Sequence, residues 1–434
     1  MVRSTVDRTN IYLVHSGLFL LQETFRLNVS RFSDGVAELP PGVGPGHSYA
    51  AAAGLQATDT HFISKIAFNR EFYDRAVDWA RVSVERARGD ESRAYMRQML
   101  GTMERHHDKV LDQRGATGSR SLGTSMSVWR TNPVPFDEKL RRKKKYKKVK
   151  AAVFQAELSS QHTPAQTWEH FNRLCAGERL LPADRERHHK CVALHHRDPY
   201  LRLGPFKLDV QHINPFIGVF RDMLAEAEME HYKEFARDRL HRSTVDSKKK
   251  TVVTRTSKQT WLDEVAGVNI SARGYYGARA AVTVADSVGM RISDRISLAT
   301  RLYTSSMSGG EPYQVSSWAL EGGHVCNLAP QIANYGIGGV YNAHPDPFMY
   351  LEREMAQEDD SRLADSVTRG DRLATFMAYL SSVELGGSTV FPNLGVSIAP
   401  EKGSAAFWWN ILSNARTDQF TVHGGCPVLV GSKW

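Results

Sequence analysis

Two histidines and one aspartate near the carboxyl end of the 434-residue sequence could together bind a metal ion. His344 and Asp346 are two residues apart, and on a strand this spacing directs both side chains to one face. His423, from a distant strand-like segment, would complete a set of two histidines and one carboxylate. This set is typical of non-haem iron(II) oxygenases, because it leaves neighbouring coordination positions open for a co-substrate and dioxygen.

The His-x-Asp spacing alone is a weak indication. The sequence has 17 histidines and also contains the spacing at His106-x-Asp108 and at His196-x-Asp198. The first of these lies in a helical pattern and the second in a stretch rich in His and Arg, so we expect structural or surface roles for both.

The residues downstream of the third motif distinguish it from the other two. His423 is followed ten residues later by Lys433, across the apolar run Val428–Val430. In a small barrel these strands would pass the same pocket, so an imidazole on the metal and a deeper ammonium could hold opposite ends of one dicarboxylate. The sequence therefore predicts an iron site with an anion-binding lysine beside it.

Strands must position these residues, and their pattern begins near residue 206. From there the sequence consists of short apolar and β-branched runs broken by Gly, Pro and Asn, which predicts a β-sandwich or barrel. Helical patterns at 223–240 and 291–304 should pack outside it. From residue 59 to about 105 the apolar spacing predicts a helical hairpin with its turn at 69–73. The residue order there fits one tetratricopeptide-like unit, and it fits an ordinary helix pair equally well.

Length and composition indicate a protein of two or three domains, because one core seldom grows beyond roughly 250 to 300 residues. The sequence is 41% hydrophobic and 24% charged, and no apolar run reaches the ~20 residues that a membrane-spanning helix needs. The apolar stretch 11–21 contains a histidine and lacks a small-residue cleavage site. It therefore favours an amphipathic helix over a signal peptide.

The net charge of +9 is concentrated in one segment. Nine of the twelve residues in Lys139–Lys150 are Lys or Arg, which leaves no net charge for the rest of the sequence. A single such run in a linker is usually solvated, so nucleic-acid binding is not expected.

The four cysteines are too few for a disulfide scaffold but allow one or two bridges. Cys175 and Cys191 are a plausible pair because they bracket a short loop, although two free thiols fit the sequence equally well. Asn28 and Asn269 begin glycosylation sequons, which matter only if the chain enters the secretory pathway.

Six ordered motifs resemble the catalytic domain of the α subunits of animal collagen prolyl 4-hydroxylases. They are Gln331–Tyr341, His344-x-Asp346, Arg372–Leu380, Gly386–Pro392, Lys402–Asn410 and Cys426–Trp434. The resemblance continues more thinly upstream, where 174–178 with Cys191 looks like the family's cysteine-bridged segment and 17–27 like the start of its dimerisation region.

This resemblance implies hydroxylation of peptidyl proline with O2 and 2-oxoglutarate, giving 4-hydroxyproline, succinate and CO2. It implies Fe(II) on His344, Asp346 and His423, with the distal carboxylate of 2-oxoglutarate on Lys433 beside Tyr335 and Thr375. It further implies L-ascorbate as a cofactor, protein disulfide isomerase as the β subunit, a proline-rich collagen-like substrate, an oligomeric state and the endoplasmic reticulum lumen. Trp409 and Trp434 are expected in the core.

The expected fold is therefore an α+β multidomain chain with a helical, tetratricopeptide-like region and a C-terminal double-stranded β-helix, or jelly roll. Its expected divisions are a dimerisation-like region (1–58), a peptide-binding region (59–114), a basic linker (115–165), a cysteine-containing connector (166–204) and the dioxygenase domain (205–434).

The sequence departs from the family pattern at three places. Ala343 replaces the family's proline and Pro345 follows His344, so the strand with two ligands should be distorted. Residues 307–327 look like an insertion, and the family continues beyond Trp434, so the domain is expected to be truncated. A related oxygenase acting on another peptide and an inactive peptide-binding chain are the alternative interpretations.

Overall fold

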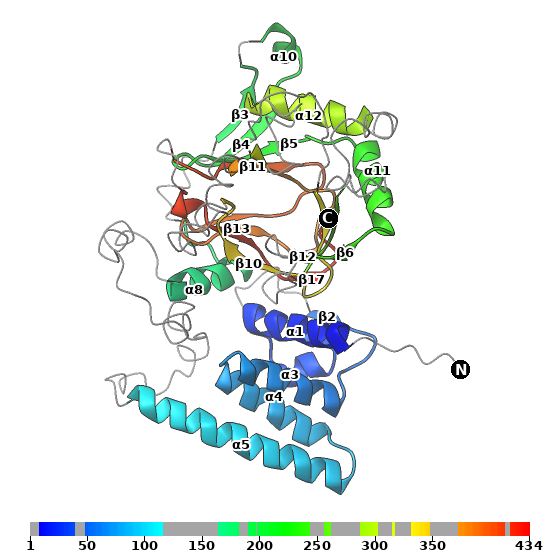
Figure 1. Ribbon diagram of the computed structural model, residues 1–434, viewed down its shortest axis with the longest axis vertical. Helices are drawn as coiled ribbons and strands as arrows, with labels where there is room; N and C mark the ends of the chain where they lie inside the picture. Colours follow the sequence, from blue (N-terminus) through cyan, green and yellow to red (C-terminus); the bar gives the residue numbers. More distant parts are fainter. Residues whose placement is uncertain are drawn as a thin grey trace, which may run out of the picture. The chain divides into compact units, whose positions relative to one another are not determined.

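The chain forms two compact units, residues 1–178 and 179–434. Helices dominate the first unit and antiparallel strands the second in this computed structural model (Figure 1). In the described ranges, no helix is both long and apolar enough to span a membrane. The structure describes residues 8–39, 48–115, 164–181, 190–196, 198–243, 256–261, 287–302, 315–316, 331–347, 372–412 and 417–434.

Three consecutive helices form the centre of the first unit. The first two confirm the helical hairpin predicted from residue 59, with its turn at 69–73. The third helix follows this hairpin. Small residues are buried in the first two of these helices, where Ala67, Ala76 and Ala80 are at most 1% exposed, and the buried Trp79 packs its ring against Phe32. The elements of this unit are α1 (Arg8–Phe25), α2 (Val29–Ser33), β1 (Val36–Glu38), β2 (Ser48–Ala50), α3 (Ala57–Asn69), α4 (Tyr73–Arg86), α5 (Asp90–Gly115) and α8 (Pro164–Cys175).

A buried ion pair joins α1 to α4. Arg75 Nε donates to Glu23 Oε2 at 2.6 Å, and the two side chains are 9% and 1% exposed. Burial lowers the pKa of Arg75, but the Glu23 carboxylate more than offsets this and raises it. Arg75→Met should lower the free energy of unfolding of this unit by about 3 to 5 kcal/mol, because it removes the positive charge that faces a buried carboxylate.

Denaturant unfolding followed by circular dichroism measures this effect. Arg81→Met is the matched control, because Arg81 pairs with Glu104 at 3.0 Å on the surface, with side chains 58% and 38% exposed. We expect this control to change stability by at most about 1 kcal/mol. Equal effects of the two substitutions would contradict the prediction.

Two antiparallel sheets form the framework of the second unit. The larger has the order β3-β4-β5-β15-β11-β8 and the smaller the order β10-β16-β13-β14. Their strands are β3 (Lys190–Leu194), β4 (Phe206–His212), β5 (Ile217–Arg221), β8 (Val315–Ser316), β10 (Tyr341–His344), β11 (Arg372–Ala378), β13 (Thr389–Phe391), β14 (Val396–Ile398), β15 (Ala405–Trp409) and β16 (His423–Gly425).

Shorter elements complete this unit. A three-stranded sheet has the order β6-β7-β9, and β12 pairs with β17. These elements and the helices of the unit are α10 (Pro199–Leu203), α11 (Glu226–Arg237), β6 (His241–Arg242), β7 (Lys258–Trp261), α12 (Ser287–Thr300), β9 (Gln331–Asn334), β12 (Leu385–Gly386), η4 (Gln419–Thr421) and β17 (Val428–Val430).

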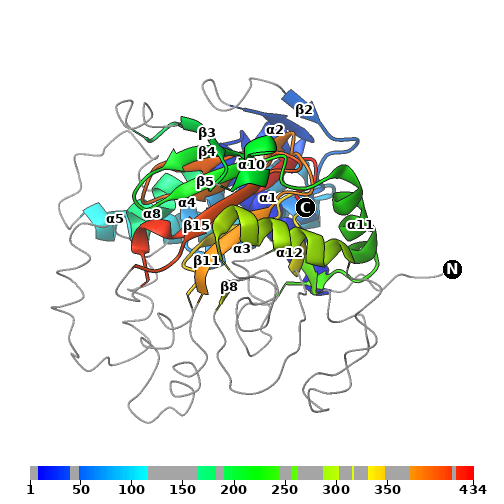
Figure 2. The ribbon, with the colours of Figure 1, turned by 90° about the horizontal axis from the view of Figure 1, so that it is seen from above.

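Alternating residues of the larger sheet face two different cores. On β15, Trp408 packs with Phe391 and Ile398 of the smaller sheet, while Phe407 faces the opposite way. On that second face Ile292 and other residues of α12 and α11 cover the strands, and Figure 2 shows α12 lying across them. This confirms that the two predicted helical segments pack outside the strands.

Cys191 is an exposed, free thiol, so the predicted Cys175–Cys191 bridge was wrong. The pairing of β3 with β4 places Cys191 opposite Asp209. The thiol donates a hydrogen bond to the Asp209 carboxylate, which raises the pKa of Cys191. The pairing of these strands therefore places Cys191 beside Asp209 and not beside Cys175.

The two glycosylation sequons, the basic run and the expected insertion stay predictions. Asn28 is exposed, and its side chain accepts from Arg31 N at 3.0 Å as the N-cap of α2. Asn269, the basic run 139–150 and most of 307–327 lie outside the described residues.

Candidate metal centre

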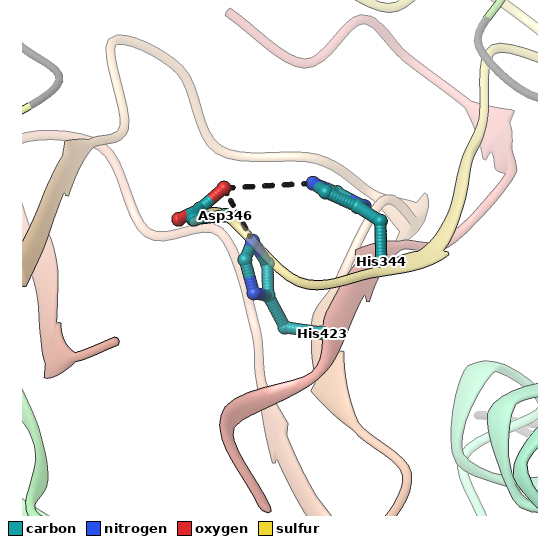
Figure 3. A group of neighbouring side chains, drawn as sticks. All are labelled: His344, Asp346 and His423. Atoms are coloured by element: carbon teal, nitrogen blue, oxygen red, sulfur yellow. Dashed lines mark ion pairs between the residues drawn. The ribbon is translucent and has the colours of Figure 1, made fainter. Parts of the chain in front are cut away.

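The pairing of β10 with β16 brings two candidate ligands together. His344 ends β10 and lies directly opposite His423, the first residue of β16. Asp346 follows in a bend beyond Pro345, so the proline ends the strand between the two ligands, in line with the distortion expected there. The ligand atoms of His344, Asp346 and His423 lie within 4.8 Å of one another, and Figure 3 shows the three side chains converging.

Backbone carbonyls fix the tautomer of both imidazoles. His344 Nδ1 lies 2.7 Å from the carbonyl oxygen of Asn342, and His423 Nδ1 lies 3.0 Å from that of Thr421. Because a carbonyl oxygen only accepts, each Nδ1 carries a proton, so in the neutral form of each ring it is Nε2 that has the free lone pair. Both Nε2 atoms lie 3.7 Å from Asp346 Oδ1. Three electron-pair donors therefore face one another, an arrangement that fits a divalent metal ion between them.

Asp346 is held as an anion in this buried cluster. Its burial, at 9% exposure, by itself raises the pKa of the carboxyl. The imidazoles of His423 and His344, then Arg372 and the hydroxyl of Thr375, outweigh burial and lower that pKa below its ordinary value. An ionised carboxylate is the form that binds metal.

The other two His-x-Asp motifs have structural roles, as predicted. His106 lies on α5 with its ring against those of Phe68 and Tyr73. His196 Nε2 lies 2.8 Å from the carbonyl oxygen of Ala299, and Asp198 is the N-cap of α10. Within the described part of the chain, His344, Asp346 and His423 are the group that brings three such ligands together.

A cavity of about 230 Å³ contains the three candidate ligands and also Lys433. Lys433 is 6% exposed, and its Nζ donates to Thr389 Oγ1 at 3.1 Å. The ammonium also lies over the rings of Tyr379 at 5.3 Å and Tyr335 at 5.8 Å. Burial lowers the pKa of Lys433 to about 7. Lys433 therefore offers its ammonium group to an anion bound in this cavity.

Two residues beside Lys433 escaped the sequence analysis. Thr389 accepts from Lys433, and it also accepts from the hydroxyl of Tyr379 at 2.9 Å. Both belong to motifs already singled out, and the alternation of β13 could have indicated that Thr389 faces inward with Phe391. Tyr335, which the resemblance had indicated, lies beside Lys433 through two backbone hydrogen bonds of 2.8 and 3.0 Å.

Thr375 has a different neighbour from the one expected. It lines the cavity, but its hydroxyl donates to Asp346 Oδ2. Thr375 and Tyr379 point to the same side of the chain, but four residues of an extended strand separate them by about 13 Å. Thr375 is therefore at the metal-ligand end of the cavity, and Tyr379 is at the end with Lys433.

Comparison with known proteins finds sequence relatives of this chain. Residues 330–434 match the 2OG-Fe(II) oxygenase superfamily. The chain is 32% identical over 270 residues to prolyl 4-hydroxylase subunit alpha-2 of Gallus gallus and 33% identical over 271 residues to the human subunit alpha-1. Each alignment covers 61% of this chain, but only 41% and 42% of the relatives.

A solved structure is also similar. It is the viral collagen prolyl hydroxylase of Paramecium bursaria Chlorella virus-1 in its 2OG complex, at 22% identity and a TM-score of 0.28, covering 50% of this chain and 90% of that one. The sequence relatives confirm the resemblance that the motifs indicated: residues 330–434 match the 2OG-Fe(II) oxygenase superfamily, and the chain is similar to prolyl 4-hydroxylase alpha subunits over 61% of its length.

Proposed function

We propose that this chain is a 2-oxoglutarate- and Fe(II)-dependent oxygenase that hydroxylates peptidyl proline. The observation that supports this most strongly is the single cavity that contains both the His–Asp–His cluster and a buried lysine. Such a cavity suits a metal ion and a small dicarboxylate side by side. The similarity to prolyl 4-hydroxylase alpha subunits supports proline as the target.

Each residue of the cluster has a defined task in this proposal. His344 Nε2, His423 Nε2 and Asp346 Oδ1 hold Fe(II), which with 2-oxoglutarate and O2 supplies the oxidising chemistry. Lys433 binds the distal carboxylate of 2-oxoglutarate. Thr389 accepts hydrogen bonds from Tyr379 and from Lys433, which use both lone pairs of its hydroxyl oxygen. Its hydroxyl proton can therefore be donated to the same carboxylate of 2-oxoglutarate.

The wider assignment also follows the similarity to the alpha subunits. We propose a double-stranded β-helix for the two sheets and a tetratricopeptide-like, peptide-binding role for the helices around residues 59–114. A proline-rich, collagen-like peptide would be the substrate and protein disulfide isomerase the β subunit of an oligomer. L-Ascorbate would maintain the iron, and the endoplasmic reticulum lumen would be the location.

An assay of 2-oxoglutarate consumption tests the proposed function. Purified chain with protein disulfide isomerase, Fe(II) and a proline-repeat peptide should release succinate, and mass spectrometry should find 4-hydroxyproline. His344→Ala should abolish both signals, whereas His196→Ala should leave them unchanged because His196 binds only a backbone carbonyl. Turnover with other peptides alone would favour a related oxygenase. Peptide binding without succinate release would favour an inactive peptide-binding chain.

The pKa of Lys433 predicts how co-substrate binding depends on pH. A dicarboxylate binds the charged ammonium, and the free protein loses that charge as pH rises through about 7. The affinity for the non-reacting analogue N-oxalylglycine, measured by calorimetry on Mn(II)-loaded protein, should therefore weaken by about tenfold per pH unit above pH 7. In Lys433→Arg, whose guanidinium stays charged, residual binding should not change over this range. Constant affinity of the wild type between pH 7 and 9 would argue against this role.

A further inference from the structure

A hydrogen-bonded relay reaches the candidate metal ligand Asp346 from the neighbouring strands. Asn410, which follows β15 and is 1% exposed, donates from Nδ2 to Thr375 Oγ1 at 2.9 Å. Thr375 in turn donates to Asp346 Oδ2. We infer that Asn410 and Thr375 are positioning residues that hold Asp346 as a ligand through Oδ1 alone. This inference rests on the proposed function.

The direction of each hydrogen bond follows from the chemistry of the three groups. Thr375 gives its single hydroxyl proton to Asp346 Oδ2, because a carboxylate oxygen that serves a metal ligand accepts hydrogen bonds. Having no second proton, Thr375 can then only accept from Asn410, which requires the amide nitrogen on that side. The polarity of the relay is thus fixed from one end to the other.

The relay leaves the two oxygens of Asp346 in different situations. Oδ1 faces both Nε2 atoms at 3.7 Å, whereas Oδ2 is held by Thr375. The backbone on either side is also fixed. Arg372 donates to the carbonyl oxygen of Asp346 at 3.0 Å, and Asn410 N donates to that of Leu373 at 2.9 Å. The carboxylate therefore cannot rotate without breaking the part-buried hydrogen bond from Thr375.

Holding Oδ2 away from the metal has a chemical purpose. A carboxylate that binds through both oxygens takes one more coordination position than a carboxylate that binds through one. The proposed reaction requires open positions for the co-substrate and for dioxygen. The relay would preserve those positions, and it would also aim Oδ1 at the metal before the metal arrives.

Substitutions of Thr375 test the relay without measuring turnover. In Thr375→Val, which keeps the shape but loses the hydroxyl, we expect the affinity for Mn(II), measured by calorimetry, to fall about 10- to 100-fold. Water-proton relaxation of the Mn(II)-loaded variant should also fall, because Oδ2 displaces a water ligand. Thr375→Ser should restore both values. Thr300→Val removes a hydroxyl that donates to Ile296 O and accepts from Leu302 N at the end of α12, and should change neither.

Each outcome bears on the relay separately from the proposed function. Wild-type affinity and relaxation in a folded Thr375→Val protein would overturn the relay and leave the proposed function intact. Wild-type protein that binds no Mn(II) would overturn both. If circular dichroism shows that the valine variant does not fold, Thr375→Ala decides by the same two measurements.

Discussion

His423→Ala is expected to lower the affinity for Mn(II) or Fe(II) by at least about a hundredfold. Loss of a metal ligand weakens binding more than loss of a residue that only hydrogen-bonds to a ligand. His423 contributes Nε2 from a ring that is 6% exposed and packed against Trp408 and Phe391. Succinate release should be abolished at the same time. Calorimetric titration with Mn(II) and an anaerobic titration with Fe(II) measure the binding directly.

His196→Ala is the matched control for this substitution. His196 also belongs to a His-x-Asp motif, but its Nε2 bonds to the carbonyl oxygen of Ala299. Its removal should leave metal affinity unchanged. Circular dichroism shows whether each variant is folded. A folded His423→Ala protein with wild-type metal affinity would mean that this cluster is not the metal site.

Lys433→Met should weaken binding of 2-oxoglutarate by roughly 2 to 5 kcal/mol, or about thirtyfold and more, because a buried carboxylate would lose its charged partner. Methionine retains most of the volume of the side chain, so the loss isolates the ammonium. Steady-state kinetics should show a raised KM for 2-oxoglutarate, and metal affinity should not change. Lys402→Met is the control, since Lys402 pairs with Glu226 and Glu230 at the surface.

The same substitution should stabilise the protein in the absence of co-substrate. The pKa of Lys433 falls from 10.5 in the unfolded chain to about 7 in the fold, so the buried charge destabilises the fold most fully below pH 7. As pH rises from 7 toward 10.5, Lys433 is already neutral in the folded protein but still charged in the unfolded chain, so this penalty declines. The gain should be roughly 3 to 5 kcal/mol at pH 6 and smaller at pH 9. Thermal unfolding at the two pH values checks this, and an equal gain at both would contradict it.

Local patterns in the sequence were sufficient for the helices but not for the whole site. The apolar period from 59 to about 105 predicted the hairpin that the structure has at 57–86, and it predicted the two helices outside the strands, because one amphipathic face determines each helix. The spacing of His344 and Asp346 likewise indicated their proximity. That β10 would end at His344, with Asp346 in the bend that follows, depended on Pro345, which the sequence also displayed.

Long-range pairing limited the rest of the prediction. The sequence connected His423 to the other ligands only through the strand-like run to Lys433 and the resemblance, since strand register across distant segments has no local signal. For the same reason the hydrogen bond from Thr375 to Asp346 was not foreseen and Thr389 was missed. The predicted Cys175–Cys191 bridge was wrong because closeness in sequence does not determine which residue lies beside a cysteine on a strand.

The strand that presents His423 consists otherwise of two glycines, Gly424 and Gly425. Such a strand has few side chains to fix its alignment, and a slip by one residue would turn the histidine to the other face of the sheet. A bound ion would oppose that slip, because it ties His423 to its cross-strand partner His344. Metal binding would in this way favour the correct register of this strand. A newly made chain would therefore reach that register more reliably where the ion is plentiful.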